Sequence, residues 1–305
     1  MIITAIIVII IVILVTQPER DYKKTNYYNT THNPYQKVRS DLGLFGEYMC
    51  YKYLMDYEKT GARFLFNTYI PRENDTTEVD VIMIHSTGLY VLESKNYSGW
   101  IFGTDTNQYW TQTLPQGNKS IKEKFLNPVK QNETHIKYLK KLFGEGVPFY
   151  SIVVFSERCT FKSLTVKQDA DYKVIQRNYL RRTIDEIASR PPILTSEQIE
   201  SIYNQLYPYT QVTETVKQEH IQHINQRINQ QQNVQPITVP VVNAPVTESS
   251  VTSEPIPFTE EPTDFFCPDC GAAIILKTAQ GGENVGKQFY YCTNYPKCTY
   301  VKERI

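Results

Sequence analysis

Two apolar runs separated by a short turn form the clearest pattern in this chain. From Val79 to Ile84 every residue is apolar except Asp80, and Leu89 to Leu92 is apolar again. Between the runs, Ser86-Thr87-Gly88 is typical of a turn, because glycine adopts positive φ without steric cost. The pattern predicts two antiparallel strands joined by a tight hairpin, and Glu93-Ser94-Lys95 closes the second strand.

The length of the turn decides which polar residues meet. A two-residue loop pairs His85 with Gly88 and sets Asp80 opposite Glu93, whereas a three-residue loop shifts the register by one position. Opposed residues on one face lie about 4.5–5.5 Å apart at Cβ, and Lys95 shares a face with Glu93. Two carboxylates that face each other among aliphatic residues repel, and a divalent cation between them would remove that cost.

The hairpin therefore indicates a candidate metal site. Asp80 and Glu93 would hold Mg²⁺ or Mn²⁺, and Lys95 would orient or polarise a water molecule, as a metal-dependent phosphodiester hydrolase requires. The alternative is an exposed Glu–Lys pair at a strand end beside a solvated aspartate.

Capping residues and periodicity predict further elements of an α/β fold. Ser40 or Asp41 can cap a helix that runs to about Tyr57, and Asn127 caps another helix with Pro128 at its first position. Shorter patterns predict a second hairpin (100–111), a buried strand (151–155), two helices (179–189 and 196–206) and a marginal helix (216–230).

The N-terminus carries an almost uninterrupted apolar run, Ile2 to Val15. As a helix, residues 1–16 span about 24 Å, slightly less than the hydrocarbon core of a bilayer. A signal peptide is the competing interpretation, but no positive leading region or small-residue cleavage site is present. We expect a single-pass anchor in the cell membrane. Arg20, Lys23 and Lys24 after the run place the bulk of the chain in the cytoplasm by the positive-inside rule.

Four of the six cysteines lie in the last forty residues, as a Cys-x2-Cys pair and a Cys-x5-Cys pair. These pairs are Cys267 with Cys270, and Cys292 with Cys298. The spacing is typical of a tetrahedral Zn²⁺ site in a reducing compartment, and bound zinc would supply the folding energy of so small a segment. A redox dithiol and free thiols are the alternatives. The other two cysteines, at positions 50 and 159, are expected to be buried.

Composition divides the chain into five parts. Beyond the anchor (1–16) we expect a juxtamembrane linker (17–36), a main domain (37–208), a disordered linker (209–262) and a cysteine-rich module (263–305). Net charge is zero, so any attraction for nucleic acid is local. The stretch from Lys119 to Lys141 holds seven lysines and two glutamates, and predicts a net basic helix beside the carboxylates or a solvated helix face.

The arrangement of Asp80 followed by Glu93-x-Lys95 resembles the PD-(D/E)xK nuclease core. The flanking motifs GEYMCYKYL, FNTYIPRENDTTEVDVIMI, FLNPVKQNETHIKYL and YSIVVFS resemble, in order and spacing, the nuclease-related domain NERD over residues 37–161. This resemblance implies a mixed sheet flanked by helices and metal-dependent cleavage of nucleic acid, with DNA favoured and no small-molecule cofactor.

The same resemblance implies roles for two helical residues. Glu47 would reach back to the metal, although a glutamate near a helix N-terminus is also favourable with the helix dipole. Gln131 would hydrogen-bond the attacking water or the scissile phosphate, and the alternative is a plain helix-surface residue. His135, one turn further on, is expected to be structural.

The C-terminal segments CPDCGAAIILK and KQFYYCTNYPKCTY resemble the zinc ribbon of type IA DNA topoisomerases. Lys287, Tyr290, Tyr295 and Lys297 combine aromatic and basic side chains that suit stacking on unpaired bases and contacts to phosphates. The chain is therefore interpreted as a membrane-anchored, metal-dependent nuclease acting on DNA, with a zinc ribbon that binds nucleic acid. The alternative is a non-catalytic DNA-binding tether or a scaffold at the membrane.

Overall fold

The computed structural model describes residues 16–73, 75–116, 119–167, 171–232, 258–266, 273–279, 287–292 and 300–303. The chain divides into two compact units, residues 1–212 and 213–305. Nine strands of the first unit are described: β1 (Arg63–Pro71), β2 (Thr76–His85), β3 (Gly88–Lys95), β4 (Gly99–Thr104), β5 (Tyr109–Gln116), β6 (Lys119–Leu126), β7 (Phe149–Phe155), β8 (Cys159–Thr165) and β9 (Tyr172–Gln176).

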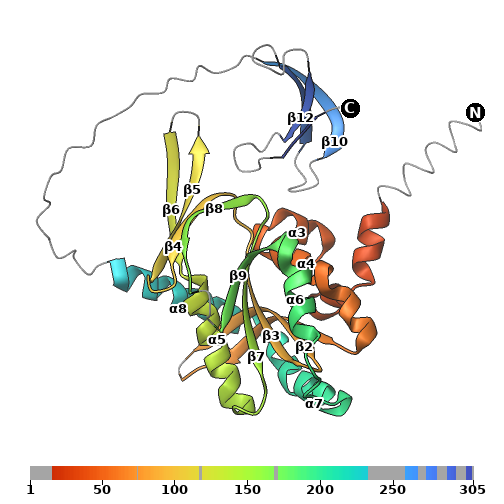
Figure 1. The fold of residues 1–305 in the computed structure, drawn as a ribbon, viewed down its shortest axis with the longest axis vertical. Helices are drawn as coiled ribbons and strands as arrows, with labels where there is room; N and C mark the ends of the chain where they lie inside the picture. The colour runs from red at the N-terminus through yellow and green to blue at the C-terminus, as the bar shows by residue number, and fades with distance from the viewer. Residues whose placement is uncertain are drawn as a thin grey trace, which may run out of the picture. The chain divides into compact units, whose positions relative to one another are not determined.

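Helices of the first unit come before β1, between β6 and β7, and after β9. They are α2 (Asn26–Thr31), α3 (Tyr35–Ser40), α4 (Leu42–Leu54), α5 (Pro128–Phe143), α6 (Leu180–Ala188) and α7 (Ser196–Leu206), with short 3₁₀ segments η1 (Met55–Thr60), η2 (Arg177–Tyr179) and η3 (Tyr207–Thr210). The α/β class and a mixed sheet flanked by helices are thereby confirmed (Figure 1).

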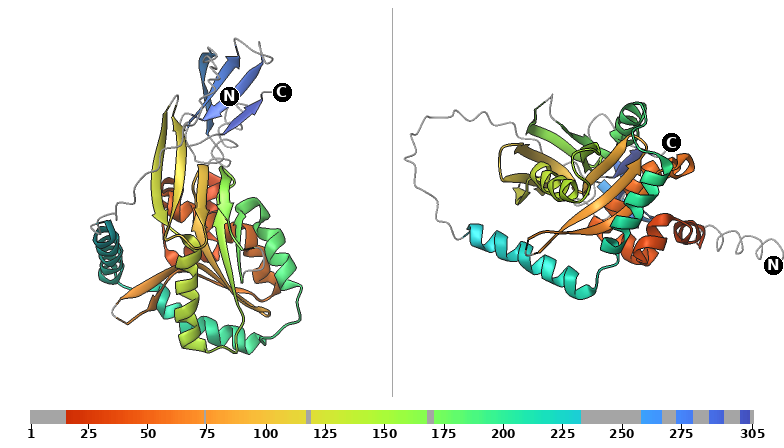
Figure 2. Two further views of the ribbon diagram at one scale, coloured as in Figure 1. Left: turned by 60° about the vertical axis from the view of Figure 1, so that its left-hand side comes forward. Right: turned by 90° about the horizontal axis from the view of Figure 1, so that it is seen from below.

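The central sheet has the strand order β1-β2-β3-β7-β9. The first three strands are antiparallel, and β3, β7 and β9 run parallel. A second sheet has the order β6-β5-β4-β8. Figures 1 and 2 show helices on both faces of the central sheet. One face packs with α4 and α6 around Tyr51 and Ile184, and the other packs with α5 and α7 around Leu139 and Ile202.

Both predicted helix caps are present. The Asp41 carboxylate accepts hydrogen bonds from the backbone N–H groups of Gly43 (2.9 Å) and Leu44 (3.0 Å), so α4 begins after it. The Asn127 side chain accepts from the Val129 N–H at 3.0 Å and starts α5, with Pro128 at the first position. The predicted hairpins, the strand 151–155 and the helices near 180–188 and 196–206 are confirmed as well.

Two predicted elements of the first unit are wrong. The expected linker at 17–36 is largely helical, and Tyr22 and Tyr27 are buried in the core because their rings pack against Tyr48. The basic stretch from Lys119 to Lys141 is not a single helix face: it divides at Asn127 into β6, which pairs with β5, and α5, which starts at the predicted cap.

The expected membrane anchor lies almost entirely outside the described residues, which begin at Thr16. Among the helices that the structure describes, none is long and apolar enough to cross a membrane.

The second unit contains α8 (Glu214–Gln232) and four antiparallel strands, β10 (Phe258–Phe266), β11 (Ala273–Ala279), β12 (Gln288–Cys292) and β13 (Val301–Glu303). The predicted marginal helix is confirmed as α8. The expected disordered linker is wrong at its C-terminal end, where β10 begins at Phe258 and pairs with β11. Residues 233–257 lie outside the described part of the chain.

Candidate metal and catalytic site

The hairpin between β2 and β3 has the predicted two-residue turn. His85 pairs with Gly88, and the ladder continues to Val81 paired with Leu92. The next position in this register sets Asp80 opposite Glu93. The backbone pairing between β2 and β3 ends before this position, and the Ser94 N–H donates instead to the Asp80 side chain, at Oδ2, over 2.7 Å. The structure therefore brings Asp80 to the end of β3 that carries Glu93 and Lys95.

A backbone irregularity gives Asp80 its unusual position in the sheet. The pairs on either side of it are Phe66 with Val81 and Thr68 with Val79, and Asn67 between them has a φ of 46°. Residues two apart in a regular strand share a face. Val79 and Val81 nevertheless lie in different cores. The change of face occurs at Asp80, which is consequently close to charged groups on both sides of the sheet.

Glu93 is held by two donors on the α5 side of the sheet. It is 2% exposed, and its two carboxylate oxygens accept separately from Lys95 Nζ and from His135 Nε2, the latter at 3.0 Å. His135 Nδ1 lies 2.7 Å from the Thr77 hydroxyl. Because a carboxylate only accepts, His135 Nε2 carries a proton, and in the neutral ring Nδ1 accepts from Thr77. The four side chains form one chain of hydrogen bonds.

Glu47 occupies the α4 side of the sheet. It is 7% exposed, and its Oε2 accepts from Asn67 Nδ2 at 2.8 Å and from the Tyr27 hydroxyl at 3.3 Å. The preceding residue, Gly46, allows α4 to approach β3 closely, since a Cβ there would lie 2.8 Å from Ser94 Oγ. Close packing of α4 on β3 thus places Glu47 near Asp80.

Charge is unevenly compensated across this cluster. Burial raises the pKa of Asp80 well above its usual range, and the neighbouring carboxylates Glu93 and Glu47 raise it further. Burial also raises the pKa of Glu47, to about 8. Burial acts the same way on Glu93, but Lys95 and His135 outweigh it and lower the pKa of Glu93 to about 2. Burial lowers the pKa of Lys95, yet Glu93 and Asp80 raise it overall.

In this site the negative charge of the carboxylates Asp80, Glu93 and Glu47 therefore exceeds the positive charge of Lys95. Within the described ranges, no three His, Cys, Asp or Glu side chains lie close enough together to enclose a metal ion. Mg²⁺ is usually bound by one or two carboxylates together with waters and substrate phosphates. Asp80 uses Oδ2 for its hydrogen bond to Ser94, which leaves Oδ1 to bind a cation. The pair Asp80 and Glu93 therefore fits an open magnesium-type site rather than an all-protein cage.

Gln131 lies in the second turn of α5, half-buried and four residues before His135. Residues four apart share a helix face, so Gln131 faces the same side as the Glu93 contact. Sequence reasoning treated His135 as structural and missed Thr77, Asn67 and Tyr27. The four-residue spacing of His135 from Gln131 could have indicated that His135 also faces the site. Nothing in the sequence indicated the backbone irregularity at Asn67.

The C-terminal candidates are only partly described. Cys292 is buried at the end of β12, while Cys267, Cys270, Cys298, Tyr295 and Lys297 lie outside the described residues. Lys287 is exposed and Tyr290 is half-buried on β12. The two remaining cysteines, Cys50 and Cys159, are buried as predicted.

Comparison with known proteins identifies the part of the chain that contains this site. Residues 42–156 match the family model described as "NERD: Nuclease-related domain". Over 190 residues the chain is 28% identical to an uncharacterized protein of Bacillus anthracis, an alignment that covers 62% of this chain and 86% of that protein. No solved structure matches the chain. The nuclease-related domain predicted from the motifs is thus confirmed at residues 42–156, which include α4, the β2–β3 hairpin and α5.

Proposed function

Because residues 42–156 form a nuclease-related domain, we propose that this chain hydrolyses phosphodiester bonds of nucleic acid, DNA in preference to RNA, with a divalent cation. The observation that carries the proposal is the meeting of Asp80 and Glu93 at one end of the hairpin, with Lys95 bonded to Glu93. Buried carboxylates repel one another, so this arrangement is costly unless a cation is bound nearby.

Asp80 and Glu93 would hold Mg²⁺ or Mn²⁺. Such an ion stabilises the charge that develops on the phosphate and lowers the pKa of a bound water. Lys95 has three N–H donors, of which one is used by Glu93, so the others can orient a water or a phosphate oxygen. Gln131, on the same face of α5 as His135, would offer an amide that both donates and accepts.

The remaining residues fix the geometry of the two carboxylates. His135, whose other ring nitrogen is bonded to Thr77, holds the second oxygen of Glu93, and the Ser94 N–H holds one oxygen of Asp80. Glu47 contributes negative charge from the α4 side and is itself oriented by Asn67. Catalytic groups held this way need little reorganisation when the substrate binds.

The test is incubation of the full-length chain with plasmid DNA, single-stranded DNA and RNA, each with and without Mg²⁺ or Mn²⁺. We expect cation-dependent cutting of DNA that is abolished by a chelator. A chain that binds DNA but cuts none of the substrates with either cation would instead be a non-catalytic tether, and the nuclease proposal would be wrong.

Two finer parts of the proposal rest on sequence alone. The spacing of Cys267, Cys270, Cys292 and Cys298 supports one bound Zn²⁺ that stabilises a nucleic-acid-binding module. Metal analysis of the purified chain would refute this if no zinc is found. The apolar run in residues 1–16 supports an anchor that keeps the nuclease at the cell membrane with its bulk in the cytoplasm. Recovery of the full-length chain in the soluble fraction without detergent would refute the anchor.

A further inference from the structure

The second sheet, with the strand order β6-β5-β4-β8, has one face in the core and one outside it. On the core side, Ile101 and Trp110 are fully buried, and Trp110 stacks on Phe155 of the central sheet with 5.9 Å between the ring centres. Side chains alternate between the two faces of a strand, so Trp100, which precedes Ile101, lies on the opposite face. It is 39% exposed, although tryptophan is highly buried on average.

Three lysines share the face of Trp100, and these four residues define what is called here the outer face. Trp100 pairs with Thr113, which pairs with Lys122, and the next row on this face ends at Lys124. On β8, Lys162 is the extra residue where the register with β4 shifts, and its Nζ lies 5.0 Å from the centre of the Trp100 ring. The lysines therefore come from β6 and β8, and the indole lies on a strand between them.

The positive charge of the outer face is not compensated by neighbouring acidic groups. The four strands contain one acidic residue, Glu123. It pairs with Gln112, which pairs with Ile101, so Glu123 lies on the other face of the sheet. Among the described residues, the three lysines form no ion pair. Because the chain as a whole has no net charge, this local excess is what would attract a polyanion.

A polyanion with accessible bases matches both features of the outer face. Lysines bind phosphates as point charges, and exposed aromatic rings stack on unpaired bases. In a duplex the faces of the bases are covered by their neighbours, and an acidic peptide would leave the indole unused. Within the described part of the chain, Lys162 makes no ion pair or side-chain hydrogen bond. A stacked base is worth more than an exposed cation–π contact, so Lys162 can turn from Trp100 to a phosphate.

The outer face begins beside the candidate catalytic site. The Ser156 N–H donates to the Lys95 carbonyl at 2.9 Å, and Arg158 donates to the Asn96 carbonyl at 2.8 Å and to its side-chain oxygen at 2.9 Å. These contacts tie together the segments that lead from β3 into β4 and from β7 into β8. Trp100 follows Lys95 by five residues, so their Cα atoms are at most about 18 Å apart. A few nucleotides can cover that length.

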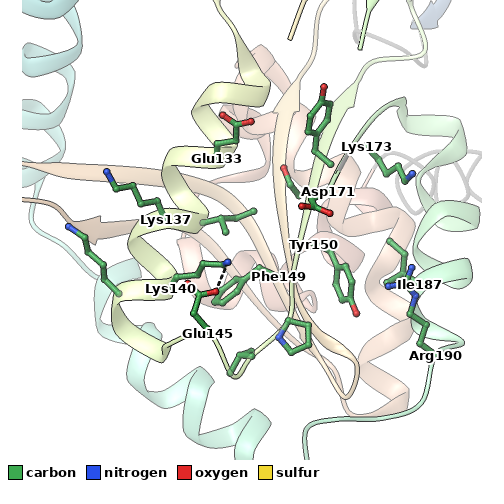
Figure 3. Close-up of a pocket in the computed structure, with 16 residues that line it drawn as sticks. Glu133, Lys137, Lys140, Glu145, Phe149, Tyr150, Asp171, Lys173, Ile187 and Arg190 are labelled. Carbon is green, nitrogen blue, oxygen red and sulfur yellow. Dashed lines mark hydrogen bonds and ion pairs between the residues drawn. The ribbon is translucent and has the colours of Figure 1, made fainter. Parts of the chain in front are cut away.

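The cavity between α5, the starts of β7 and β9, and the end of α6 offers no equivalent surface (Figure 3). It has a volume of about 850 Å³ and is lined by Phe149 and Tyr150, but these rings belong to different cores on opposite faces of the central sheet. The Tyr150 ring already packs 4.8 Å from that of Tyr90, with Arg190 5.5 Å from its centre. The cavity therefore has no free ring beside an excess of one charge.

We propose that the outer face binds single-stranded nucleic acid, with phosphates at Lys122, Lys124 and Lys162 and a base on Trp100. Its role as a substrate platform rests on the proposed nuclease function, since a strand bound here would lead to the carboxylates. Binding itself requires neither cleavage nor a divalent cation.

Fluorescence tests the contact with Trp100, because the chain contains only two tryptophans and the other, Trp110, is fully buried. A 12-nucleotide DNA strand, added to the full-length chain without divalent cations, should quench tryptophan emission. Trp100→Phe should abolish the quenching and keep the affinity, measured by anisotropy of a labelled strand. Trp100→Ala should weaken binding about tenfold, the usual effect of losing one stacked base. No quenching in wild type, or quenching that persists in Trp100→Phe, would overturn the proposal.

Substitution of the three outer-face lysines by alanine tests the phosphate contacts. This triple variant should bind the strand about tenfold or more weakly. The slope of log K against log salt should fall by about 2, since each phosphate contact of a single strand contributes about 0.7. The matched control replaces Lys24, Lys52 and Lys59, which are exposed elsewhere on the first unit, and should keep both affinity and slope. Equal losses in the two triple variants would refute the assignment to the outer face.

Two comparisons complete the test. The duplex of the same 12-nucleotide sequence should bind about tenfold or more weakly than the strand, because its bases are not free to stack. Equal affinity for the duplex, or equal quenching by a polyglutamate peptide, would overturn the single-strand assignment. Glu93→Gln should keep full strand affinity. Strand binding without cleavage would therefore contradict only the nuclease function, whereas cleavage with no quenching of Trp100 would contradict only the outer face.

Discussion

Asp80 has surroundings unlike those of an ordinary strand residue. It lies where two adjacent strands change face, it accepts a backbone hydrogen bond from Ser94, and it is near carboxylates on both sides of the sheet. Burial and these neighbours disfavour its ionised form. Ionised Asp80 therefore costs stability in this environment, and a bound divalent cation would offset that cost.

Asp80→Asn should stabilise the metal-free chain. Because the folded-state pKa of Asp80 is raised, ionisation of Asp80 destabilises the fold increasingly as pH rises above the unfolded pKa, and the neutral amide removes this effect. Each kcal/mol recovered would raise the melting temperature by about 2–4 °C. Thermal unfolding of wild type and the variant at neutral pH, with a chelator present, measures the change in melting temperature. A lower melting temperature in the variant would show that Asp80 is stabilised by the protein alone.

His135 is predicted to act by positioning Glu93. His135→Ala removes the 3.0 Å contact to Glu93 and leaves Thr77 without its partner, so metal affinity or turnover should fall about 10–100-fold. His135→Gln keeps an N–H for Glu93 and should recover part of the loss. Metal titrations and cleavage rates of both variants check this. Equal defects in the two variants would indicate a packing role.

At the scale of elements, the β2–β3 hairpin and the caps of α4 and α5 could be predicted because their signals are local. Alternating apolar runs, turn residues and capping side chains are each readable within a few positions. Strands β8 and β9 were missed, since each is paired with a strand that does not directly precede or follow it along the chain in a hairpin; β1 was also missed, although it pairs with the next strand, β2. β6 was not recognised as a strand because its lysine-rich sequence, Lys119 to Leu126, has no long apolar run, and its pairing with β5 decides its conformation.

Gly46→Ala tests the close packing of α4 on β3. Alanine favours a helix by about 1 kcal/mol over glycine. Its Cβ, however, would lie 2.8 Å from Ser94 Oγ and 2.9 Å from Asn96 Cβ. We expect a net loss of about 1–3 kcal/mol in unfolding free energy, as for other overpacked sites. Gly146→Ala, where a Cβ meets no atom within 4 Å, is the control for denaturant unfolding. A more stable Gly46→Ala variant would contradict this packing.

For the first unit as a whole, the domain begins earlier in the chain than composition suggests. The polar residues of segment 17–36 predicted a linker, yet its buried tyrosines contribute to the core. Tyr27 packs 4.8 Å from Phe66 and donates to Glu47, so this segment also supports the site. Composition averages over a segment and therefore hides two buried rings among polar neighbours.

Two truncations test this boundary. Removal of residues 1–15 should leave cooperative unfolding intact, because residues 16–31 still supply their buried rings. Removal of residues 1–36 deletes Tyr22 and Tyr27, which are 1% and 0% exposed, and each buried large ring is worth on the order of 3–5 kcal/mol. Thermal unfolding, monitored by circular dichroism, measures the stability of the two truncated chains. A cooperative, equally stable 37–305 fragment would show that the domain begins where composition placed it.

The central claim is that Asp80, Glu93 and Lys95 together hydrolyse phosphodiester bonds with a divalent cation. Its most direct test is the rate of cleavage of end-labelled DNA at saturating Mg²⁺ or Mn²⁺ by wild type, Lys95→Ala and the exposed α4 control Lys52→Ala. We expect cutting by wild type and the control, and a loss of about 10²–10⁴-fold in Lys95→Ala, as for removal of a proton-transfer group. Equal rates in wild type and Lys95→Ala would contradict the account.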